Sequence, residues 1–203
     1  AEWASLPMPA EPTPSPASSA TTASAGAWAW RLAGGLGVKP NANALVDLRL
    51  AQTYILDTRD QPFTAAATAA VFWITFLVLT GDKVGALAWA LLVHGMQLSM
   101  YFHLHGEDPE SYRPESAFAT RLRLEWRMLF PGLVWASATW LMFPAGNLTH
   151  ILLLYIFVSG MTSISTAALA QWWLAGVLFG VPGYASLALR MVLEPGEVPF
   201  IMG

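Results

Sequence analysis

The feature that most constrains this chain is a long uncharged stretch between Arg127 and Arg190, in which only His150 could carry a charge near neutral pH. Such a stretch is too long for one buried helix, and it lacks the charged side chains that keep a soluble surface in water. A bilayer core is crossed by about 20 consecutive apolar residues. The stretch divides into three segments of that length, which we predict as membrane crossings: 126–145, 148–169 and 170–191.

The composition of the whole chain agrees with a membrane protein. Charged residues make up 11% of the 203 residues, whereas soluble domains carry about 25%. The net charge of −3 argues against nucleic-acid binding, which needs a concentrated basic surface. The chain has no cysteine, which excludes disulfide scaffolds, thiolate metal sites and thiol catalysis. Its ten tryptophans suit the aromatic belts found at membrane interfaces.

The segment before the crossings divides into a leader and a helix. Residues 1–43 are rich in Pro, Ala, Ser and Thr, and we predict a disordered or extended leader ending in an interfacial segment. Residues 44–60 are predicted to form an amphipathic helix, because Val46, Leu50 and Tyr54 recur at helical spacing. The charged residues of this helix are expected on its opposite, polar side.

Two further crossings are predicted at 63–80 and 84–102, joined by a tight turn at Gly81, Asp82 and Lys83. The fold class is therefore an all-α polytopic membrane bundle of about five transmembrane helices within 44–203. The tail GEVPFIMG turns apolar again at the end of the sequence. We expect a sixth crossing to begin there, in a chain that continues.

The orientation follows from the segment 103–125, which holds most of the charge in this half of the chain. Arg121 and Arg123 in this segment, and Arg127 beyond it, directly precede a crossing. Positive charge is concentrated in short cytoplasmic loops. We therefore expect the inner membrane of a bacterium as the location, with the N-terminus in the cytoplasm.

His94 is the one cofactor-binding candidate, because ionisable residues inside a membrane are costly and often functional. Haem ligation or a proton relay would suit it, but no second histidine is evident at the same depth. We favour a neutral histidine that hydrogen-bonds a neighbouring helix, with Gln97 or Ser99 taking part. No cofactor is predicted, although contacts with lipid, quinone or pigment remain open, and no catalytic constellation is found in the sequence.

His103 and His105, followed by Glu107 and Asp108, bring metal-capable side chains to the end of the second crossing. Alternate residues of a helix point apart, and no matching ligand set occurs elsewhere in the sequence. We therefore predict no metal site and interpret the segment as a solvated charged loop.

Small residues mark the faces on which helices approach closely. Gly176 and Gly180 form a GxxxG motif in the fifth predicted crossing, and Gly160 lies among serines in the fourth. Packing within the chain and dimerisation between chains are equally good interpretations of these faces. Pro182 in the same helix as the GxxxG motif is expected to kink it.

A resemblance to a known family rests on several short segments of this chain. They are LVDLRLAQTYILDTR in the amphipathic helix, Trp126-Arg127, Gly132-Leu-Val-Trp135, Leu141-Met-Phe143-Pro144, Gly160-Met161, Pro182 and Leu187-Ala-Leu-Arg190. This pattern resembles the N-terminal six-helix membrane sensor region of bacterial hybrid histidine kinases and diguanylate cyclases. The resemblance covers about 44–203, and it implies a signal-input module that precedes a cytoplasmic output domain.

Three functions remain as hypotheses. The first is a non-catalytic integral membrane subunit, built on the sensor-like module, that packs in a larger bacterial membrane complex of respiratory or photosynthetic type. The second is the signal-input domain of a histidine kinase or diguanylate cyclase. The third is a haem or quinone protein that uses His94 and His150. We favour the first, with the lipid bilayer and other membrane subunits as partners and no enzymatic activity.

Overall fold

The computed structural model describes residues 40–41, 43–144 and 147–193, and within these residues all regular structure is helical. Four helices are long and apolar enough to cross a membrane: α3 (Gln61–Thr80), α4 (Lys83–Gly106), α8 (Leu148–Ala168) and α9 (Trp173–Leu193). The predicted all-helical membrane bundle is thereby confirmed, but its count of about five is not, since four such helices are found. The predicted leader lies almost entirely outside the described residues.

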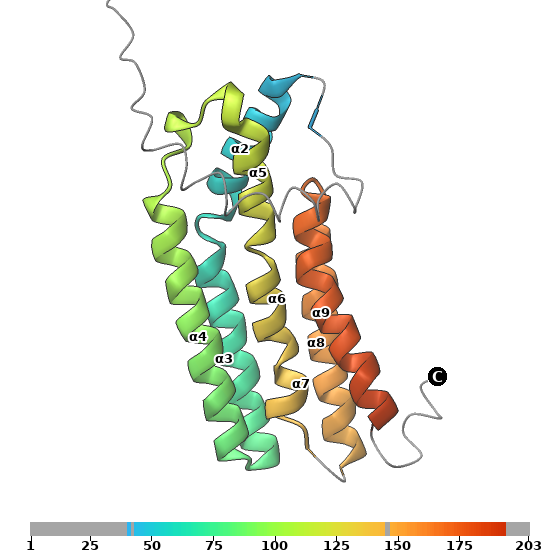
Figure 1. Cartoon of the computed structure of the whole chain (residues 1–203). Helices are drawn as coiled ribbons and strands as arrows, with labels where there is room; N and C mark the ends of the chain where they lie inside the picture. Colours follow the sequence, from blue (N-terminus) through green and yellow to red (C-terminus); the bar gives the residue numbers. More distant parts are fainter. Residues whose placement is uncertain (1–39, 42, 145–146, 194–203) are drawn as a thin grey trace, which may run out of the picture. The chain divides into compact units, whose positions relative to one another are not determined.

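Helices α3 and α4 form an antiparallel hairpin (Figure 1). Gly81 ends α3 in the left-handed conformation, with φ 71°, which glycine adopts without a steric penalty. The Asp82 carboxylate then accepts a hydrogen bond from the Gly85 amide and caps the start of α4. Phe72 and Trp89 meet edge to face across the hairpin, with ring centroids 5.5 Å apart. The two helices therefore pair through a two-residue link and an aromatic contact.

The segment predicted as the third crossing is divided. It begins at the last residue of α5 (Ala117–Trp126) and continues through α6 (Leu129–Ala136) and α7 (Ala138–Leu141), which follow one another along the bundle (Figure 1). Pro131 has no N–H to bond the Arg127 carbonyl, which accounts for the first break. At the second, the hydroxyl of Ser137 bonds the Val134 carbonyl at 2.7 Å, an alternative bond of the kind that bends helices.

This division corrects two predictions. The range 126–145 does not form one helix of membrane-spanning length, because turns at residues 127–128 and at Ser137 divide it into shorter helices. The range 103–125 is not a simple solvated loop, since α4 extends to Gly106 and α5 begins at Ala117. Between them lie two short 3₁₀ turns, η1 (Pro109–Ser111) and η2 (Pro114–Ser116).

Helices α6, α8 and α9 meet along glycines. A Cβ at Gly180 would lie 2.8 Å from Thr166 Oγ1 on α8, so the two helices approach closely there. On the other side of α9, a Cβ at Gly132 of α6 would lie 2.8 Å from the Leu178 carbonyl oxygen. That carbonyl is the one left without its helical donor by Pro182, which lies inside α9. The freed oxygen therefore faces the helix that has room for it.

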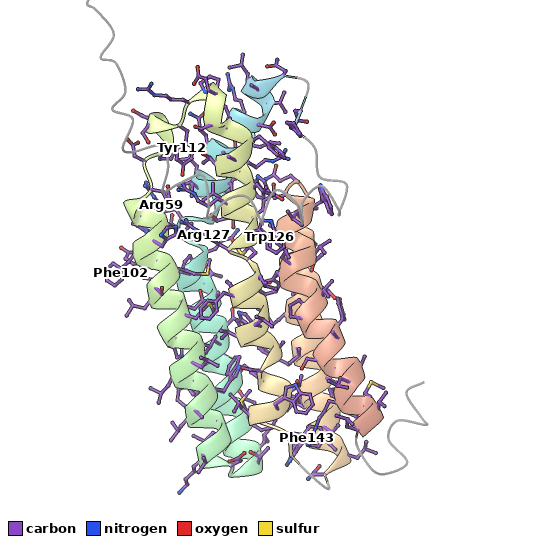
Figure 2. All side chains as sticks on the ribbon, in the orientation of Figure 1. Arg59, Phe102, Tyr112, Trp126, Arg127 and Phe143 are labelled. Carbon is purple, nitrogen blue, oxygen red and sulfur yellow. The ribbon has the colours of Figure 1, made fainter. Side chains whose placement is uncertain are left out.

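A polar cap covers one end of the bundle, formed by α2 (Ala44–Thr58), η1, η2 and α5. The turn between α8 and α9 is attached to α2 through Trp172, whose indole N–H donates to the Leu50 carbonyl at 3.2 Å. Trp172 also meets the Tyr54 ring edge to face at 5.2 Å. Figure 2 places Arg59, Tyr112 and Arg127 at the cap end and Phe143 at the opposite end.

The buried side of α2 differs from the predicted stripe. Its buried residues are Asp47, Ala51, Tyr54, Ile55 and Thr58, whereas Val46 is 44% exposed. Asp47 was expected on the polar side, yet it is 1% exposed. The burial of this carboxylate is explained below by a cation on α5.

The outer surface of the long helices is apolar. Figure 2 shows Phe102 pointing away from the bundle, and this residue is 65% exposed. Side chains of this kind occur on every long helix: Val71, Ile74 and Val78 on α3, Leu87, Leu91 and Leu98 on α4, Ile156 and Ile164 on α8, and Val181, Leu189 and Val192 on α9. Such an exposed apolar surface needs lipid or protein to cover it.

Candidate functional site

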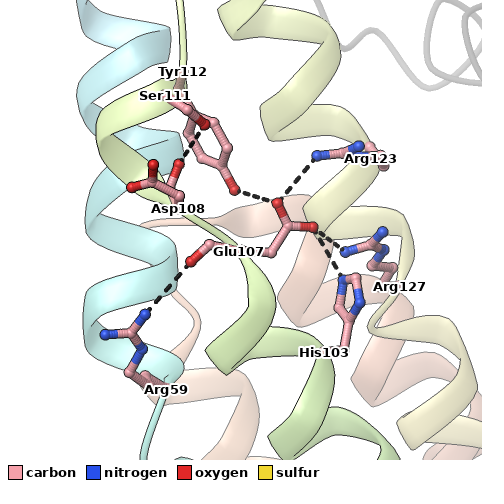
Figure 3. Close-up of polar contacts among 8 residues, drawn as sticks. All are labelled: Arg59, His103, Glu107, Asp108, Ser111, Tyr112, Arg123 and Arg127. Carbon is pink, nitrogen blue, oxygen red and sulfur yellow. Dashed lines mark hydrogen bonds and ion pairs between the residues drawn. The ribbon is translucent and has the colours of Figure 1, made fainter.

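The charged residues of the cap form two clusters, and the first is centred on Glu107, the residue that ends α4. Its carboxylate accepts hydrogen bonds from Tyr112 Oη at 2.8 Å and from Arg127 Nη1 at 2.9 Å. His103 Nε2 lies 3.2 Å away and Arg123 Nη2 lies 3.4 Å away (Figure 3). We call these five residues the Glu107 cluster. It joins the end of α4 to α5, to the α5–α6 junction and to the loop after η1.

The environment of Glu107 is only partly shielded from water. The Glu107 side chain is 14% exposed, but those of Arg127 and Arg123 are 37% and 53% exposed. Burial, followed by the hydrogen bond to Glu107, raises the pKa of Tyr112 to about 12. The phenol therefore keeps its proton and donates a hydrogen bond to the carboxylate. Arg59 of α2 reaches the Glu107 backbone carbonyl at 3.4 Å, which adds α2 to the same junction.

The second cluster is buried and consists of Asp47, Arg121 and Glu125, which we call the Arg121 cluster. Arg121 Nη1 lies 2.7 Å from Asp47 Oδ1, and Arg121 Nε lies 3.3 Å from Glu125 Oε1. Asn41 donates to Asp47 through both its backbone N–H, at 2.9 Å, and its side-chain amide, at 2.6 Å. All three members of the cluster are less than 10% exposed. One guanidinium thus serves two carboxylates in a site that water barely reaches.

Glu125 of α5 also lies beside the first turn of α9. Burial raises the pKa of its carboxyl above the ordinary value of 4.5, while the Arg121 guanidinium and the backbone amides of Ala175 and Leu174 oppose that rise. These amides belong to the first turn of α9, where backbone N–H groups lack helical partners and favour a negative charge. The Arg121 cluster therefore connects α2, α5 and α9.

Two cavities lie beneath the cap. The boundary cavity, of about 390 Å³, runs between α4 and α6 and touches the Glu107 cluster through His103 and Arg127. The inner cavity, of about 420 Å³, is lined by α3, α4, α6 and α8 together with Thr58 of α2 and Phe179 of α9. Its walls are mainly apolar, and Gln97 of α4 lines it from a position that is 6% exposed. Small-molecule sites in proteins occupy about 300–1,000 Å³, so both cavities are large enough to hold a ligand.

The structure places the predicted histidines in different surroundings. His94 accepts a hydrogen bond at Nε2 from the Trp73 indole of α3, at 3.1 Å. It therefore contacts a neighbouring helix, although neither Gln97 nor Ser99 takes part. His103 faces Glu107, whereas His105 Nδ1 lies 3.0 Å from the Tyr101 carbonyl of its own helix. His150 is at the opposite end of the bundle, in the first turn of α8.

The predicted packing residues also lie in different surroundings. Gly176 and Gly180 face Thr166 of α8, and Pro182 lies inside the same helix. Gly160 differs, because no described atom of the neighbouring helices lies within 4 Å of where its Cβ would be. It therefore takes no part in close helix packing within the described chain.

Sequence reasoning missed the Arg121 cluster, and it named Gln97 only as a participant in the His94 hydrogen bond and not as a cavity residue. Asp47 and Arg121 were read as surface charges, because nothing in either segment alone shows that they meet. One signal was available for Asp47, since it is spaced at helical intervals with Ala51, Tyr54 and Thr58. Gln97 is an amide in an otherwise apolar crossing, and such polar residues tend to mark contacts.

The fold and the cap together define an all-helical bundle of membrane-spanning type with an ion-paired cap. Comparisons with protein-family models, with curated proteins and with solved structures each find no match.

Proposed function

We propose that this chain is a non-catalytic integral membrane subunit that packs against another transmembrane helix in a larger bacterial membrane complex. The observation that carries the proposal is a small-residue face on α8 that the rest of the described chain covers only in part, through the 2.6 Å hydrogen bond between the Ser163 and Tyr184 hydroxyls. Ser163 and Ala167 are exposed, and Ser159 and Gly160 are half-buried. Small residues at this spacing let helix backbones approach closely in lipid, where dispersion contacts replace the hydrophobic effect.

The cap supports a structural role. Glu107 connects the ends of α2, α4 and α5. Arg121 of α5 is paired with Asp47 of α2, and its neighbour Glu125 contacts the first turn of α9. Because α8 packs against α9 where Gly180 meets Thr166, a fixed start of α9 helps to hold the outer face of α8 in one orientation. A subunit that presents a defined helix face to a partner needs such rigidity, because ordering a loose bundle would weaken binding.

The proposed topology has five crossings, with Trp126 at the end of α5, α6 and α7 acting together as the third. Backbone hydrogen bonds from Met128 N to Glu125 O and from Ser137 N to Leu133 O continue across the two breaks. Among the described residues, six arginines lie at the cap end, and Lys83 and Arg190 lie at the other. By the positive-inside rule we assign the cap, and with it the start of α2, to the cytoplasmic side of a bacterial inner membrane.

The test is Gly160→Leu in the full chain, purified from native membranes in mild detergent and weighed intact with everything that accompanies it. Because the space beyond Gly160 is open, the leucine clashes with nothing inside the described chain. We expect the wild type to carry stoichiometric partners and the variant to lose them. Its unfolding temperature should stay within a few degrees of the wild type.

The matched control is Gly95→Leu, because Gly95 of α4 also has open space beyond its Cα. This variant should keep the partners. A wild type that purifies alone, or a Gly160→Leu variant that keeps every partner, would contradict the proposal. A partner of the same mass as the chain would identify it as a second copy.

A second candidate function is a membrane signal-input module, favoured by the Glu107 cluster above the boundary cavity. A ligand or a helix movement at His103 or Arg127 would disturb ion pairs that join three helix ends. The same intact-mass measurement separates the two candidates. A native polypeptide much heavier than these 203 residues, carrying a kinase or cyclase domain, would favour the input module.

A further inference from the structure

The inner cavity contains an amide that has no partner in the described chain. Gln97 is 6% exposed, lines the cavity, and makes no hydrogen bond with any other described residue. The side chain as a whole is buried, but its amide atoms are not among the enclosed polar atoms without a partner, so they reach the open space of the cavity. The groups around it on α4 are apolar, with Val93 and Met96 buried beside it. The amide therefore has unused hydrogen-bonding capacity that is directed at an open space.

The rest of the lining describes what would fill that space. Met100, Met128 and Met161 contribute thioethers from α4, the α5–α6 junction and α8. Trp135 and Phe179 contribute aromatic rings from α6 and α9. Thioethers and aromatic rings both make favourable contacts with a flat π system. No Asp, Glu, Lys, Arg or His lines this cavity among the described residues, so its occupant should be uncharged.

The cavity is also reachable from the bilayer. Ile164 of α8 lines it and is 67% exposed, and Thr64 of α3 lines it and is exposed as well. These two residues place part of the lining on the lipid-facing surface. A ligand dissolved in the membrane could therefore enter sideways, without passing through the charged cap.

We propose that the inner cavity binds an uncharged, lipid-soluble molecule with a flat ring and a carbonyl oxygen, the chemistry of a quinone headgroup, and that the Gln97 amide donates a hydrogen bond to that oxygen. The ring lies against the methionine and aromatic side chains, and an apolar tail leaves between α3 and α8. This inference does not depend on the proposed subunit role, since no residue of the small-residue face of α8 lines the inner cavity.

The experiment titrates decylubiquinone into the purified full chain and follows tryptophan fluorescence, which a quinone quenches and which Trp135 reports from the cavity wall. We expect saturable quenching in the wild type. Gln97→Leu should weaken the apparent affinity about tenfold, the loss expected for one buried hydrogen bond. Ala65→Phe, which places a ring in the cavity from α3, should abolish saturable binding.

A second measurement keeps the proposal falsifiable if a variant misfolds. Without quinone, Gln97→Leu should raise the unfolding temperature by a few degrees, because it replaces an amide without a partner by an apolar side chain. With quinone, the wild type should gain stability and this variant should gain much less. The control is Ser99→Val on the same helix, which lines the boundary cavity and not the inner one.

Three outcomes would overturn the inference. Quenching that rises linearly without saturation would show partitioning into detergent or lipid only. Equal affinity in the wild type, Gln97→Leu and Ala65→Phe would place binding elsewhere. Loss of binding in Ser99→Val alone would assign the quinone to the boundary cavity. The assembly test at Gly160 is unaffected by any of these results, so each proposal can fail without the other.

Discussion

The two ionic clusters of the cap use the same chemistry in different surroundings. Each combines arginine with carboxylate, and both draw on α5. The Arg121 cluster is almost fully buried, whereas the arginines of the Glu107 cluster are 37% and 53% exposed. Removing one partner of a buried ion pair strongly destabilises the fold, because the remaining charge is left without water and without an opposite charge. Exposed pairs contribute little, since water replaces the lost partner. The first cluster therefore fixes the cap, and the second can rearrange.

The strongest test of this difference between the two clusters is Arg121→Met, which leaves two buried carboxylates without their cation. We expect a loss of about 3 kcal/mol in the free energy of unfolding, the lower end for removing one partner of a buried pair. The measurement is thermal or denaturant unfolding of the detergent-purified chain, followed by circular dichroism. Asp47 keeps its two hydrogen bonds from Asn41, which limits the loss.

The matched control is Arg123→Met on the same helix. Its guanidinium is 53% exposed and 3.4 Å from Glu107, so we expect a loss below about 1 kcal/mol. Equal losses in the two variants would show that burial does not separate the two clusters.

A second effect concerns the pH dependence of Glu125. Its pKa in the folded chain is raised, chiefly by burial, so the folded chain holds this proton more tightly than the unfolded chain. The resulting stability is present below the ordinary carboxyl pKa and is lost as pH rises through the raised value. The variant Glu125→Gln stays neutral. Its free energy of unfolding relative to the wild type should therefore increase as pH rises, by at most about 1.4 kcal/mol per pH unit within that window.

The measurement compares the unfolding free energy of the two proteins from about pH 4 to about pH 8, where buried carboxyl groups titrate. Subtracting the two curves removes the other titrating groups. A wild type that gains on the variant with rising pH would mean that Arg121 and the α9 amides outweigh burial at this site.

Hydropathy predicts the long helices of this chain well, because a bilayer imposes a length of about 20 apolar residues on any crossing. The helix found at Leu148–Ala168 lies within the predicted 148–169. The divided segment Ala117–Leu141 is harder to predict, since Pro131 and Ser137 leave hydropathy almost unchanged although the helix is divided close to each of them. Side-chain contacts can be predicted from a short segment only when both partners are close in the sequence.

The candidate sites show this limit clearly. The charge of Asp47 is visible in the sequence, but its burial depends on Arg121, which lies far along the chain. His94 stands out as an intramembrane histidine and makes a hydrogen bond to Trp73. Gln97, one turn away, is predicted only to take part in the hydrogen bonding of His94, and its place in a cavity depends on five other elements that line it. Residue type identifies candidates, and packing decides among them.

The smallest expected effect on stability concerns the more exposed Glu107 cluster. Tyr112→Phe removes the hydrogen bond to Glu107 at 2.8 Å and should cost about 0.5–1 kcal/mol. The pKa of Tyr112 is raised to about 12 by burial first and by Glu107 second. The stability from this contact is therefore complete below the ordinary pKa of 10.0 and is lost as pH rises through about 12.

Glu107→Gln separates these two causes, because it removes the carboxylate and leaves the burial of Tyr112 in place. The tyrosinate absorbance of each protein, with that of its Tyr112→Phe counterpart subtracted, isolates this one phenol. In Glu107→Gln the phenol should titrate below about pH 12 but still above its ordinary value of 10.0, since burial is the larger cause. An unchanged titration would mean that the carboxylate contributes nothing, and the Glu107 cluster would then be a set of neighbouring charges without coupling. A titration at the ordinary value would mean that water reaches Tyr112 freely once the carboxylate is gone. In that case the Glu107 cluster would itself exclude the water, and it would resemble the Arg121 cluster more closely than its exposed arginines suggest.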